Sequence, residues 1–391
     1  MKNIVLISPF PPAQNPRLLK EYHTLKACEY NVKVLFASRD EWANSFDNTN
    51  QDFILVGGKK GDFNYFFTRL IFKFFIKPFY KDFSIHAISF FQYLKLRKFK
   101  ADLYIGHNLA ALPIVVKAAK FYNAKCGFDA EDFHRQEVSD NIDSKEYRLA
   151  KYIEDKYLAQ LDYITAASPL IAAEYKKLYP SLNPVVINNV FPMQNLPSFK
   201  NLEGLRTPLK LFWFSQTIGK GRGLEDVIAA MHLLKSDNLE LHLLGNVSAD
   251  SKLYFQSLAN KIQIYYYEPI PPDDIFEFAS KFDIGLALEP AFCLNNDLAL
   301  SNKLFSYAVS GLTVIASKTS AQKQFMETYP SIGKTYKIGN SVALATILKY
   351  YSENRNNLNI TKKASFDLAK NELNWEIESK KFMDTIKTLF K

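Results

Sequence analysis

The sequence predicts an α/β protein built from two Rossmann-like, doubly wound domains that face a cleft. Short apolar runs alternate with longer helical patterns, a proline-containing stretch interrupts this alternation near the middle of the chain, and the alternation then restarts. The runs are apolar almost throughout, which is typical of parallel strands covered on both faces. The length of 391 residues also suits two domains, because a single core rarely grows beyond about 250–300 residues.

The first half predicts an N-terminal domain over residues 1–195. Its expected helices include residues 16–28, 110–122 and 145–160. Its expected strands are residues 3–8, 32–37, 53–56, 102–106, 126–129, 163–166 and 185–188. The first strand is followed by PFPPAQNPR rather than by G-x-G-x-x-G. Prolines lack the backbone N–H groups that a dinucleotide pyrophosphate needs, so this turn argues against an NAD enzyme.

The second half predicts a C-terminal domain over residues 205–370, after a linker at 191–203. Its expected strands are residues 209–214, 239–244, 262–266, 284–288 and 313–316, and its expected helices are 224–234, 273–281, 303–310 and 341–353. Residues 362–391 read as one long helical pattern, whose part 371–391 we expect to pack back on the first domain. By the switch-point rule, the ligand is expected between the two domains.

The net charge and the cysteine content indicate what kind of partner and which cellular compartment to expect. The net charge of +9 favours a partner that carries negative charge, such as nucleic acid, an anionic bilayer surface or a phosphorylated substrate. Cys28, Cys126 and Cys293 are odd in number and far apart, so we expect a reducing cytoplasm. The opening run IVLIS is too short for a signal peptide, and no apolar stretch predicts a membrane-spanning helix.

A basic glycine-containing loop follows the first strand of the second half. Residues 212–222 read FWFSQTIGKGR, and a helical pattern begins immediately afterwards. Backbone N–H groups at a helix start, the positive end of the helix dipole and the cations Lys220 and Arg222 together predict a diphosphate site. The alternative is an ordinary turn that contains Gly219 and Gly221, with its basic side chains in solvent.

Residues 287–317, ALEPAFCLNNDLALSNKLFSYAVSGLTVIAS, resemble the donor-site signature of the family 4 retaining glycosyltransferases, which have the GT-B fold. Within them, SNKLFSYAVSG matches the branch of the family that reads x-N-K-L-F-E-Y-x-x-x-G. Arg222-Gly223 stands where the family usually has Lys-Gly. NIVLISPFPPAQNPRLLKEYHTL, ADLYIGHNLAALP, CGFDAEDFH and VVINNVFP resemble further family segments in the same order, so the resemblance covers most of the chain.

The resemblance implies a site for a nucleotide sugar, linked to UDP or GDP, that needs no metal and no other cofactor. Arg222 and Lys303 would neutralise the departing diphosphate, and no Asp-x-Asp metal motif is present. Ser301 and Asn302 would add N–H donors at a helix start. The remaining residues implied for the nucleotide-sugar site are Ser215, Gln216, Gly221, Gly245, Asn246, Glu268, Ile270, Leu304 and Ser306.

The same resemblance implies where the chemistry takes place. Glu289 would approach the transferred sugar. The first domain would contribute His107, Asn108, Asp129, Glu131, Asp132 and His134 on the acceptor side. The residues implied as catalytic are thus His107, Asp129, Glu131, Asp132, Arg222, Glu289 and Lys303. The structural alternatives are a hydrogen-bonded core histidine for His107, and a helix N-cap for Asp129 or Asp132.

The sequence departs from the family pattern at one position. The family has two glutamates eight positions apart, and the second usually binds the ribose hydroxyls. Here that second position aligns with Ser306 and the one eight earlier with Leu298, although Glu289 and Asp297 also lie eight apart. A hydroxyl binds ribose more weakly than a carboxylate does, so this departure concerns the ribose contact and the nucleotide preference.

Residues 63–100 combine many aromatic side chains with basic ones. Arg69, Lys73, Lys77 and Lys81 recur at every fourth position, although Pro78 must interrupt a single helix. Such mixing is typical of a segment at a membrane interface. The alternatives are that these aromatics belong to the core, or that they bind single-stranded nucleic acid. We expect an anionic membrane surface as the partner, and no nucleic acid.

We therefore expect a retaining glycosyltransferase that moves a sugar from a nucleotide donor to a glycan or lipid-linked glycan. Surface polysaccharide or glycoconjugate biosynthesis is the expected setting, in the cytoplasm and at the inner face of the cell membrane. Two alternatives remain open. One is a sugar-nucleotide epimerase on the same fold, and the other is a catalytically inactive subunit that binds nucleotide sugars or glycans.

Overall fold

The computed structural model describes residues 1–38, 50–201, 208–234 and 238–391. The chain divides into two compact units. Unit 1 comprises Met1–Asn188, Cys293–Asn295 and Ser379–Lys391, and unit 2 comprises Asn189–Phe292 and Asn296–Glu378. The last residues of the expected linker, 202–203, and the first of the expected C-terminal domain, 205–207, lie outside the described residues.

Unit 1 contains one seven-stranded sheet in the order β3-β2-β1-β4-β5-β6-β7. Every pair of neighbouring strands is parallel. The strands are β1 (Asn3–Ile7), β2 (Asn31–Ala37), β3 (Phe53–Val56), β4 (Leu103–His107), β5 (Lys125–Ala130), β6 (Tyr163–Ala166) and β7 (Val185–Val186). The chain winds outward from β1 in one direction and from β4 in the other. The carboxyl ends of β1 and β4 therefore form a switch point, where ligands of open α/β sheets bind.

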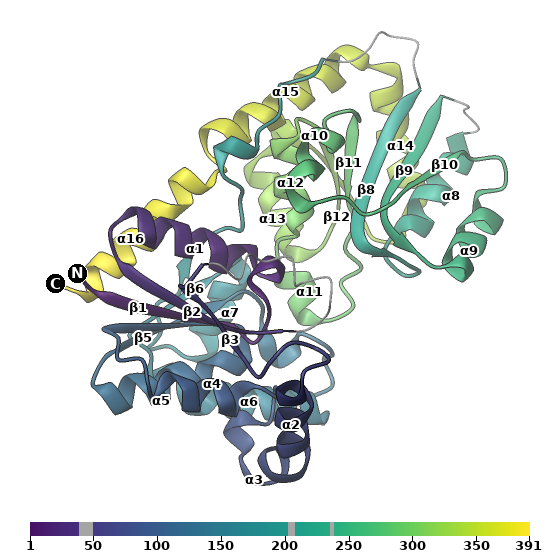
Figure 1. Cartoon of the computed structure of the whole chain (residues 1–391). Coiled ribbons are helices and arrows are strands. Elements are labelled where there is room, and N and C mark those ends of the chain that lie inside the picture. The colour runs from purple at the N-terminus through teal and green to yellow at the C-terminus, as the bar shows by residue number, and fades with distance from the viewer. Residues whose placement is uncertain (39–49, 202–207, 235–237) are drawn as a thin grey trace. The chain divides into compact units, whose positions relative to one another are not determined.

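Helices cover both faces of this sheet, with α1 over one face and α4 and α5 over the other (Figure 1). The helices of unit 1 are α1 (Pro16–Ala27), α2 (Phe63–Ile71), α3 (Lys77–Phe79), α4 (Ser89–Leu96), α5 (Leu112–Tyr122), α6 (Lys145–Tyr157) and α7 (Pro169–Leu178). Side-chain caps fix several starts. The side chain of Asn15 accepts the N–H of Leu18, and that of Ser144 accepts the N–H of Tyr147.

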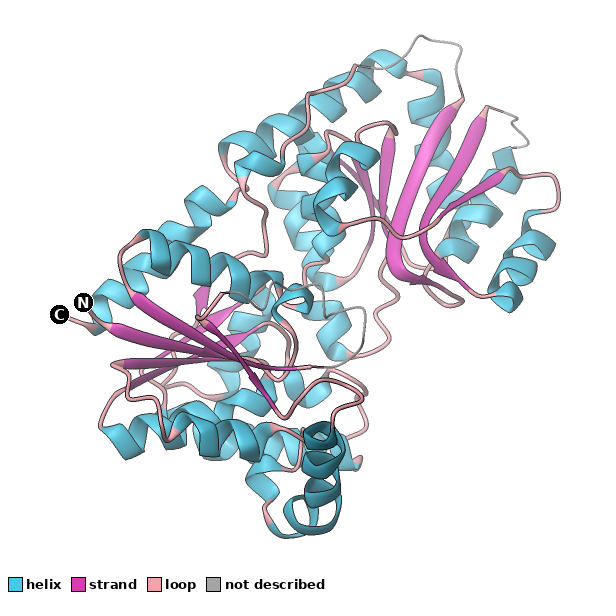
Figure 2. Ribbon diagram, in the orientation of Figure 1, coloured by secondary structure: helices cyan, strands magenta, loops and turns pink. Residues whose placement is uncertain are grey.

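Unit 2 contains a six-stranded parallel sheet in the order β10-β9-β8-β11-β12-β13 (Figure 2). The strands are β8 (Leu209–Ile218), β9 (Leu239–Val247), β10 (Ile264–Tyr267), β11 (Ile284–Ala287), β12 (Thr313–Ser317) and β13 (Gly333–Tyr336). Its helices are α8 (Leu224–Leu234), α9 (Ala249–Ala259), α10 (Ile275–Ala279), α12 (Asn302–Val309), α13 (Ser320–Thr328), α14 (Ser341–Glu353) and α15 (Arg355–Asn371). Two further helices, α11 (Leu294–Leu298) and α16 (Trp375–Leu389), contribute residues to both units.

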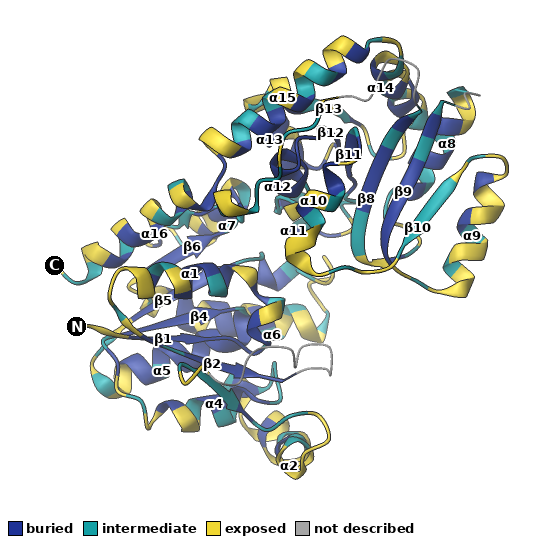
Figure 3. Ribbon diagram, turned by 45° about the horizontal axis from the view of Figure 1, so that its top comes forward, coloured by how far each residue is buried: buried dark blue, intermediate teal, exposed yellow. Residues whose placement is uncertain are grey.

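The two sheets confirm the predicted α/β class with two Rossmann-like, doubly wound units. The inner strands are mostly buried, whereas the edge strands β3, β7, β10 and β13 are mostly half-buried (Figure 3). In unit 2, Leu211 and Trp213 of β8 belong to a core cluster with α8 and α14, whereas Phe212 belongs to a second cluster with α12 and α13. Alternate residues of one strand thus serve two cores, because successive side chains point to opposite faces. This arrangement explains why the strands read as apolar throughout.

Two expected elements differ from the structure. The strand expected at 209–214 continues to Ile218, past an irregularity between Phe214 and Thr217. The single helix expected over 362–391 is instead two helices, α15 and α16, which are separated at residues 372–374. The side chain of Asn374 accepts the N–H of Ile377 and so begins a new helix.

None of the helices in the described ranges is both long and apolar enough to cross a membrane. Cys28 is exposed, Cys126 and Cys293 are buried, and all three are free thiols.

Gly285 lets an aromatic ring lie directly on β11, and this contact can be tested. A Cβ atom at this position would lie 2.2 Å from the nearest atom of the Tyr307 ring. Overpacking of this kind typically costs about 1–3 kcal/mol, so we expect Gly285→Ala to lower the free energy of unfolding by that amount. Urea denaturation measures the change. Gly219→Ala is the control, because a Cβ there meets no atom within 4 Å. Equal stability of the two variants would contradict this packing.

Candidate functional site

The residues expected to carry chemistry lie at the carboxyl edges of the two sheets, one group in each unit. In unit 2, Arg222 lies between β8 and α8, Glu289 follows β11, and Lys303 lies in the first turn of α12. In unit 1, His107 ends β4 and Asp129 lies near the end of β5, in register with it. Each group is described within its own unit.

Arg222 and Lys303 approach the same indole ring. The Cζ atom of Arg222 lies 5.8 Å from the ring centroid of Trp213, and the Nζ atom of Lys303 lies 5.7 Å from it. Trp213 is fully buried, and its Nε1–H has no hydrogen-bond partner among the described residues. The negative face of an indole attracts cations, so this one ring attracts both positive charges.

Glu289 lies at the centre of a hydrogen-bonded group. Its Oε1 accepts from Ser301 Oγ at 2.7 Å and from Lys303 Nζ at 2.9 Å, and its Oε2 accepts from Asn296 Nδ2 at 3.1 Å. Burial acts to raise the pKa of Glu289, but the Lys303 ammonium and these hydrogen bonds outweigh burial and hold it below its usual value. Glu289 is therefore ionised at neutral pH. By contrast, no carboxylate in the described ranges forms an ion pair with Arg222.

Part of the basic loop is already bonded. The N–H of Gly221 donates to Glu225 Oε1 at 2.9 Å, so this N–H is not free for an anion as the sequence analysis expected. Lys220 points its Nζ at the ring of Tyr254, 4.2 Å from the centroid. Arg222 is thus the cation of this loop that approaches Trp213.

The start of α12 offers the better set of N–H donors. Ser301 is its N-cap residue, but its hydroxyl bonds Glu289 and does not cap the helix. Because the first N–H groups of a helix have no partner within the helix, they bind anions readily. Asn302 and Lys303, which begin α12, therefore combine backbone donors with the ammonium of Lys303.

Gly245 brings the end of β9 against the irregular part of β8. Its φ is +146°, and a Cβ atom there would lie 2.0 Å from the carbonyl oxygen of Ser215. Beside it, Asn246 Nδ2 donates to the carbonyl oxygen of Gln216 at 3.2 Å. The structure thus brings Ser215, Gln216, Gly245 and Asn246 together, as expected for one site.

The remaining expected residues of unit 2 lie in different environments. Glu268 is exposed after β10, while Ile270 packs partly against the core and Leu304 is fully buried. Ser306 is also buried, and its hydroxyl donates to the carbonyl oxygen of Asn302 one turn earlier at 3.0 Å. That hydroxyl is therefore engaged within its own helix.

Asp297, the alternative partner of Glu289 in the spacing of eight, also has a structural contact. Its Oδ1 accepts the N–H of Ser320 at 2.8 Å, at the start of α13. Leu298 lies mostly buried. Neither position offers a second free carboxylate next to Glu289.

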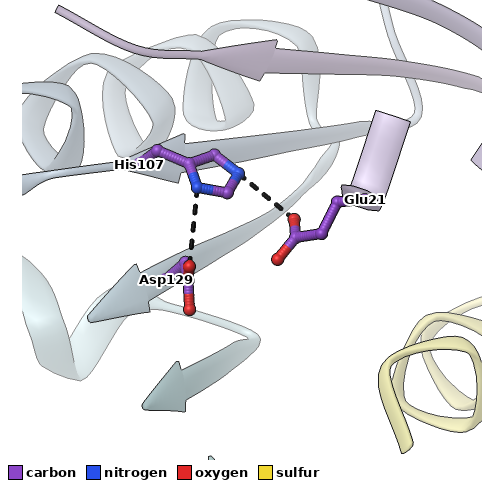
Figure 4. Close-up of side chains that lie close together, drawn as sticks. All are labelled: Glu21, His107 and Asp129. Carbon is purple, nitrogen blue, oxygen red and sulfur yellow. Dashed lines mark ion pairs between the residues drawn. The ribbon is translucent and has the colours of Figure 1, made fainter. Parts of the chain in front are cut away.

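In unit 1, His107 lies between carboxylates from different elements (Figure 4). Its Nε2 is 3.1 Å from Glu21 Oε2, and its Nδ1 is 3.5 Å from Asp129 Oδ2 and 3.4 Å from Glu131 Oε1. Burial acts to lower the pKa of His107, but Glu21, Asp129 and Glu131 together raise it well above its usual value. The imidazole is fully buried and protonated, as in the structural alternative of a hydrogen-bonded core histidine.

Asp129 is held by Arg17 of α1. Arg17 Nε donates to Asp129 Oδ2 and Arg17 Nη2 to Oδ1, each at 2.7 Å, and Arg17 Nη1 donates to the carbonyl oxygen of Ile187 at 2.7 Å. Thr165 adds a hydrogen bond to Oδ1 at 2.6 Å. Although burial acts to raise the pKa of Asp129, Arg17 and His107 hold it well below the usual range. The alternative that Asp129 caps a helix is therefore wrong.

This network fits an ion-pair cluster better than a metal site. Glu21, His107 and Asp129 offer ligand atoms within 4.8 Å of one another. Arg17, however, occupies both oxygens of Asp129, and its fixed positive charge would repel a cation.

The other acidic residues after β5 are less deeply enclosed. Glu131 is partly exposed and accepts a hydrogen bond from Asn15 Nδ2 at 2.7 Å. Asp132 accepts from Asn295 Nδ2 at 2.8 Å, and burial raises its pKa to about 6. His134 is buried, and its Nδ1 lies 2.9 Å from Glu137. Glu131 is thus the most accessible acid beside His107.

Two residues next to these groups adopt strained backbone conformations. Asn108, directly after His107, has φ +70°, and Ala291, two residues after Glu289, has φ +52°. Left-handed conformations are costly for residues other than glycine, and they persist where the surrounding structure enforces them, often at functional sites. At both positions the surrounding structure therefore enforces the backbone conformation.

The sequence did not point to four residues of these sites: Asn15, Arg17, Glu21 and Trp213. Arg17 and Glu21 lie four residues apart in the expected helix 16–28, which places them on one face. A charged pair on the face of a helix directly after the first strand was the available signal. Trp213 lay within an apolar run and gave no comparable signal.

Comparison with known proteins identifies the fold. No protein-family model matches the chain, and no curated protein matches it. A sucrose-phosphate synthase from Thermosynechococcus elongatus superposes with a TM-score of 0.74 at 13% identity, over 100% of this chain and 99% of that one. Anabaena HepE in complex with UDP and glucose gives 0.70 at 12% identity, over 99% and 100% of the two chains. A putative UDP-N-acetylglucosamine 2-epimerase from Listeria monocytogenes gives 0.62 at 10% identity, over 100% and 96%. At these identities the likeness establishes the fold, which is the two-domain GT-B fold.

The Arg17–Asp129 pair leads to a prediction about stability. Removing one member of a buried ion pair leaves the other charge uncompensated, which costs about 3–5 kcal/mol. We expect Asp129→Asn to lower the free energy of unfolding by this amount, as measured by urea denaturation. Asp162→Asn at the exposed pair with Lys125 is the control and should change stability by at most about 1 kcal/mol. A small effect at Asp129 would show that the buried pair contributes little.

The raised pKa of His107 predicts how stability depends on pH. Because the folded state binds this proton more tightly than the unfolded state does, the stabilisation is present below the unfolded value of about 6.5 and is lost as the pH rises through the folded pKa. We expect the unfolding free energy of the wild type to fall more steeply above pH ~6.5 than that of His107→Gln.

Lys20 provides the internal check of this pH experiment. Burial lowers its pKa to about 7, so it titrates in the opposite sense. It does so in both proteins, so the difference between the two curves reports on His107 and on Glu21, whose pKa His107 lowers against the effect of burial. Parallel curves would contradict a protonated His107.

Proposed function

We propose that this protein is a glycosyltransferase that moves a sugar from a nucleotide donor to a hydroxyl of a glycan or lipid-linked glycan. The observation that carries the proposal is the approach of Arg222 and Lys303 to one buried indole, beside the uncapped start of α12. Two cations and helix N–H donors in one place suit a diphosphate. The GT-B fold adds support, since Anabaena HepE of this fold was solved in complex with UDP-glucose.

The proposed reaction depends on stabilising the leaving group. The bond between the anomeric carbon and the diphosphate oxygen breaks, and its electron pair leaves with the nucleoside diphosphate. Arg222, Lys303 and the N–H groups of α12 are fixed in advance where this negative charge develops, which is the arrangement that lowers a barrier most effectively. With these charges in place we propose that no metal ion is required.

Glu289 has two tasks in this proposal. It positions the ammonium of Lys303 through a 2.9 Å ion pair. As an ionised carboxylate beside the donor, it also stabilises the positive charge that the anomeric carbon gains as the bond breaks. Retention of configuration and a UDP- or GDP-linked hexose are the finer parts of the proposal, and they rest on the family resemblance.

We assign the acceptor-side chemistry of unit 1 to Glu131. It is partly exposed, whereas His107 and Asp129 are fully buried. A group that receives a proton must come within hydrogen-bond reach of the acceptor hydroxyl, which an enclosed side chain does not do. His107 and Asn15 then position Glu131 through contacts of 3.4 and 2.7 Å.

The net charge of +9 and the expected lipid-linked acceptor support a biological setting. We propose surface polysaccharide or glycoconjugate biosynthesis at the cytoplasmic face of the cell membrane. The second candidate is a sugar-nucleotide epimerase, because the putative epimerase from Listeria monocytogenes shares the fold. An inactive nucleotide-sugar-binding subunit is the third.

Substitution of the two cations tests the diphosphate site. We expect Arg222→Ala and Lys303→Ala each to lower turnover by ~10²–10³, the loss typical of removing one preorganised donor. Lys220→Ala is the matched control, because this cation of the same loop lies over Tyr254 instead. Turnover of UDP- and GDP-sugars with and without acceptor is the measurement, and EDTA should leave it unchanged. Full activity of both variants would show that Arg222 and Lys303 do not stabilise the departing diphosphate.

The products decide between the candidates. Transfer yields free nucleoside diphosphate in proportion to glycosylated acceptor, whereas an epimerase equilibrates two nucleotide sugars without an acceptor, which NMR detects. A thermal-shift screen with UDP, GDP, dTDP and CMP identifies the nucleotide, because ligand at 100 times its Kd stabilises the native state by about 2.7 kcal/mol. Nucleotide binding with no turnover of any kind would favour the inactive subunit.

A further inference from the structure

Residues 63–80 of unit 1 expose a set of large apolar side chains. α2 and α3 are joined by a π-helical turn at Phe72–Ile76, so the segment is helical from Phe63 to Phe79 despite Pro78. Eight side chains in it are between 48% and 79% exposed, and we call them the aromatic face: Phe63, Phe66, Phe67, Leu70, Phe74, Phe75, Phe79 and Tyr80. The alternative that the aromatics of residues 63–100 belong to the core is therefore wrong for the aromatic side chains of this face, whereas Phe83 is buried.

The aromatic face reverses the usual orientation of an amphipathic helix. Phe63, Phe66, Phe67, Leu70 and Phe74 follow the spacing i, i+3, i+4, i+7, i+11, which is one side of a helix. The buried position of α2 is Thr68, whose hydroxyl donates to the carbonyl oxygen of Asn64. A surface helix normally turns its apolar side inward. Large exposed apolar patches instead mark interaction sites, and much of α2 is exposed in Figure 3.

Basic residues flank the aromatic face on one side. At about 100° per residue, Arg69 and Lys73 follow the edge of the apolar stripe. The guanidinium of Arg69 stacks on the ring of Tyr65, 3.2 Å from its centroid, and donates to the carbonyl oxygen of Tyr65. Lys73 and Lys77 are exposed, and neither forms an ion pair with a carboxylate in the described ranges. Their charges are thus available to an anionic partner.

Contacts of Asp82, two residues after this segment, hold the C-terminal end of the segment in place. Asp82 accepts from Lys156 Nζ at 2.7 Å and from the Tyr152 hydroxyl at 3.0 Å, and it pairs with Lys117 at 3.0 Å. Burial acts to raise the pKa of Asp82, but the hydrogen bonds, above all that from Lys156, hold it well below its usual value. Phe83 beside it is buried. Asp82, the single acid of residues 63–100, is therefore neutralised and does not oppose a negatively charged surface.

We propose that the aromatic face is a docking surface for an anionic lipid bilayer. Exposed Phe side chains enter the boundary between headgroups and acyl chains, while Lys73 and Lys77 bind anionic headgroups. Charge argues against a second copy of the chain as the occupant, because each copy carries a net charge of +9 and would repel the other. The inference goes beyond the transferase reaction and does not depend on it, since lipid binding is measured without donor or acceptor.

Sedimentation of the full chain with vesicles tests this docking surface. We expect binding to vesicles that contain phosphatidylglycerol, weak binding to phosphatidylcholine alone, and loss of binding as salt shortens the Debye length from about 10 Å towards 3 Å. Lys73→Glu with Lys77→Glu should weaken binding by at least about 25-fold, from about fivefold for each basic residue near the surface. Phe66→Ser with Phe74→Ser should abolish the binding to vesicles.

Matched control variants distinguish an effect of the aromatic face from a general effect of charge or of surface hydrophobicity. Lys177→Glu with Lys349→Glu makes the same charge change at exposed positions of α7 and α14. Leu253→Ser with Ile360→Ser removes two apolar side chains that are 65% and 66% exposed in unit 2. Both controls should bind vesicles like the wild type. Equal weakening by a control and its matched variant would overturn the proposal.

If the variants fail to fold, a measurement on the wild type tests the proposal instead. Backbone amides of residues 63–80 should exchange more slowly with solvent when anionic vesicles are added, while those of α8 and α14 should not change. The proposal is overturned if these amides are unaffected, or if binding is independent of anionic lipid and salt. It is also overturned if the chain dimerises in a concentration-dependent way that Phe66→Ser with Phe74→Ser abolishes, because the face would then be a protein interface.

Discussion

The buried pair of Arg17 and Asp129 is the interaction on which the switch point of unit 1 depends. It joins α1 to β5 by two hydrogen bonds of 2.7 Å, and Arg17 reaches the chain after β7 with a third. A charge this deeply buried is tolerated only when it is paired and hydrogen-bonded. Because Asp129 is held ionised, His107 retains a proton, and Glu131 has a positively charged neighbour at the edge of the network.

The candidate site of unit 2 contains fewer buried charges than the switch point of unit 1. Glu289 holds Lys303, Ser301 and Asn296 together, which leaves the first turn of α12 without a side-chain cap. A helix start normally has such a cap, and its absence leaves N–H groups for an anion. In unit 1 the buried charges thus pair with one another. In unit 2, by contrast, the N–H groups at the start of α12 remain available to a ligand.

The sequence predicted the fold well and the site in part, for physical reasons. Strand 163–166 agrees with β6, because a strand buried on both faces must be apolar throughout. Strand 53–56 agrees with the edge strand β3, which is mostly half-buried. The extension of β8 to Ile218 was missed, since SQTI carries no apolar alternation. Arg17 was missed because its partner lies 112 residues away, and separations of this kind leave no periodic signal. The basic loop was located correctly, but the bond from Gly221 to Glu225 required coordinates.

The C-terminal helix has a consequence for how the protein is made. Ser379–Lys391 belongs to unit 1, where Phe390 stacks on Tyr30 and Lys2 lies over its ring. Unit 1 therefore contains residues that a ribosome delivers only after those of unit 2. Domains usually fold in order as they leave the ribosome. Here the strands of unit 1 all precede unit 2, whereas Ser379–Lys391 follows it, so a chain interrupted within unit 2 has every strand of the N-terminal sheet but lacks the part of α16 that belongs to unit 1.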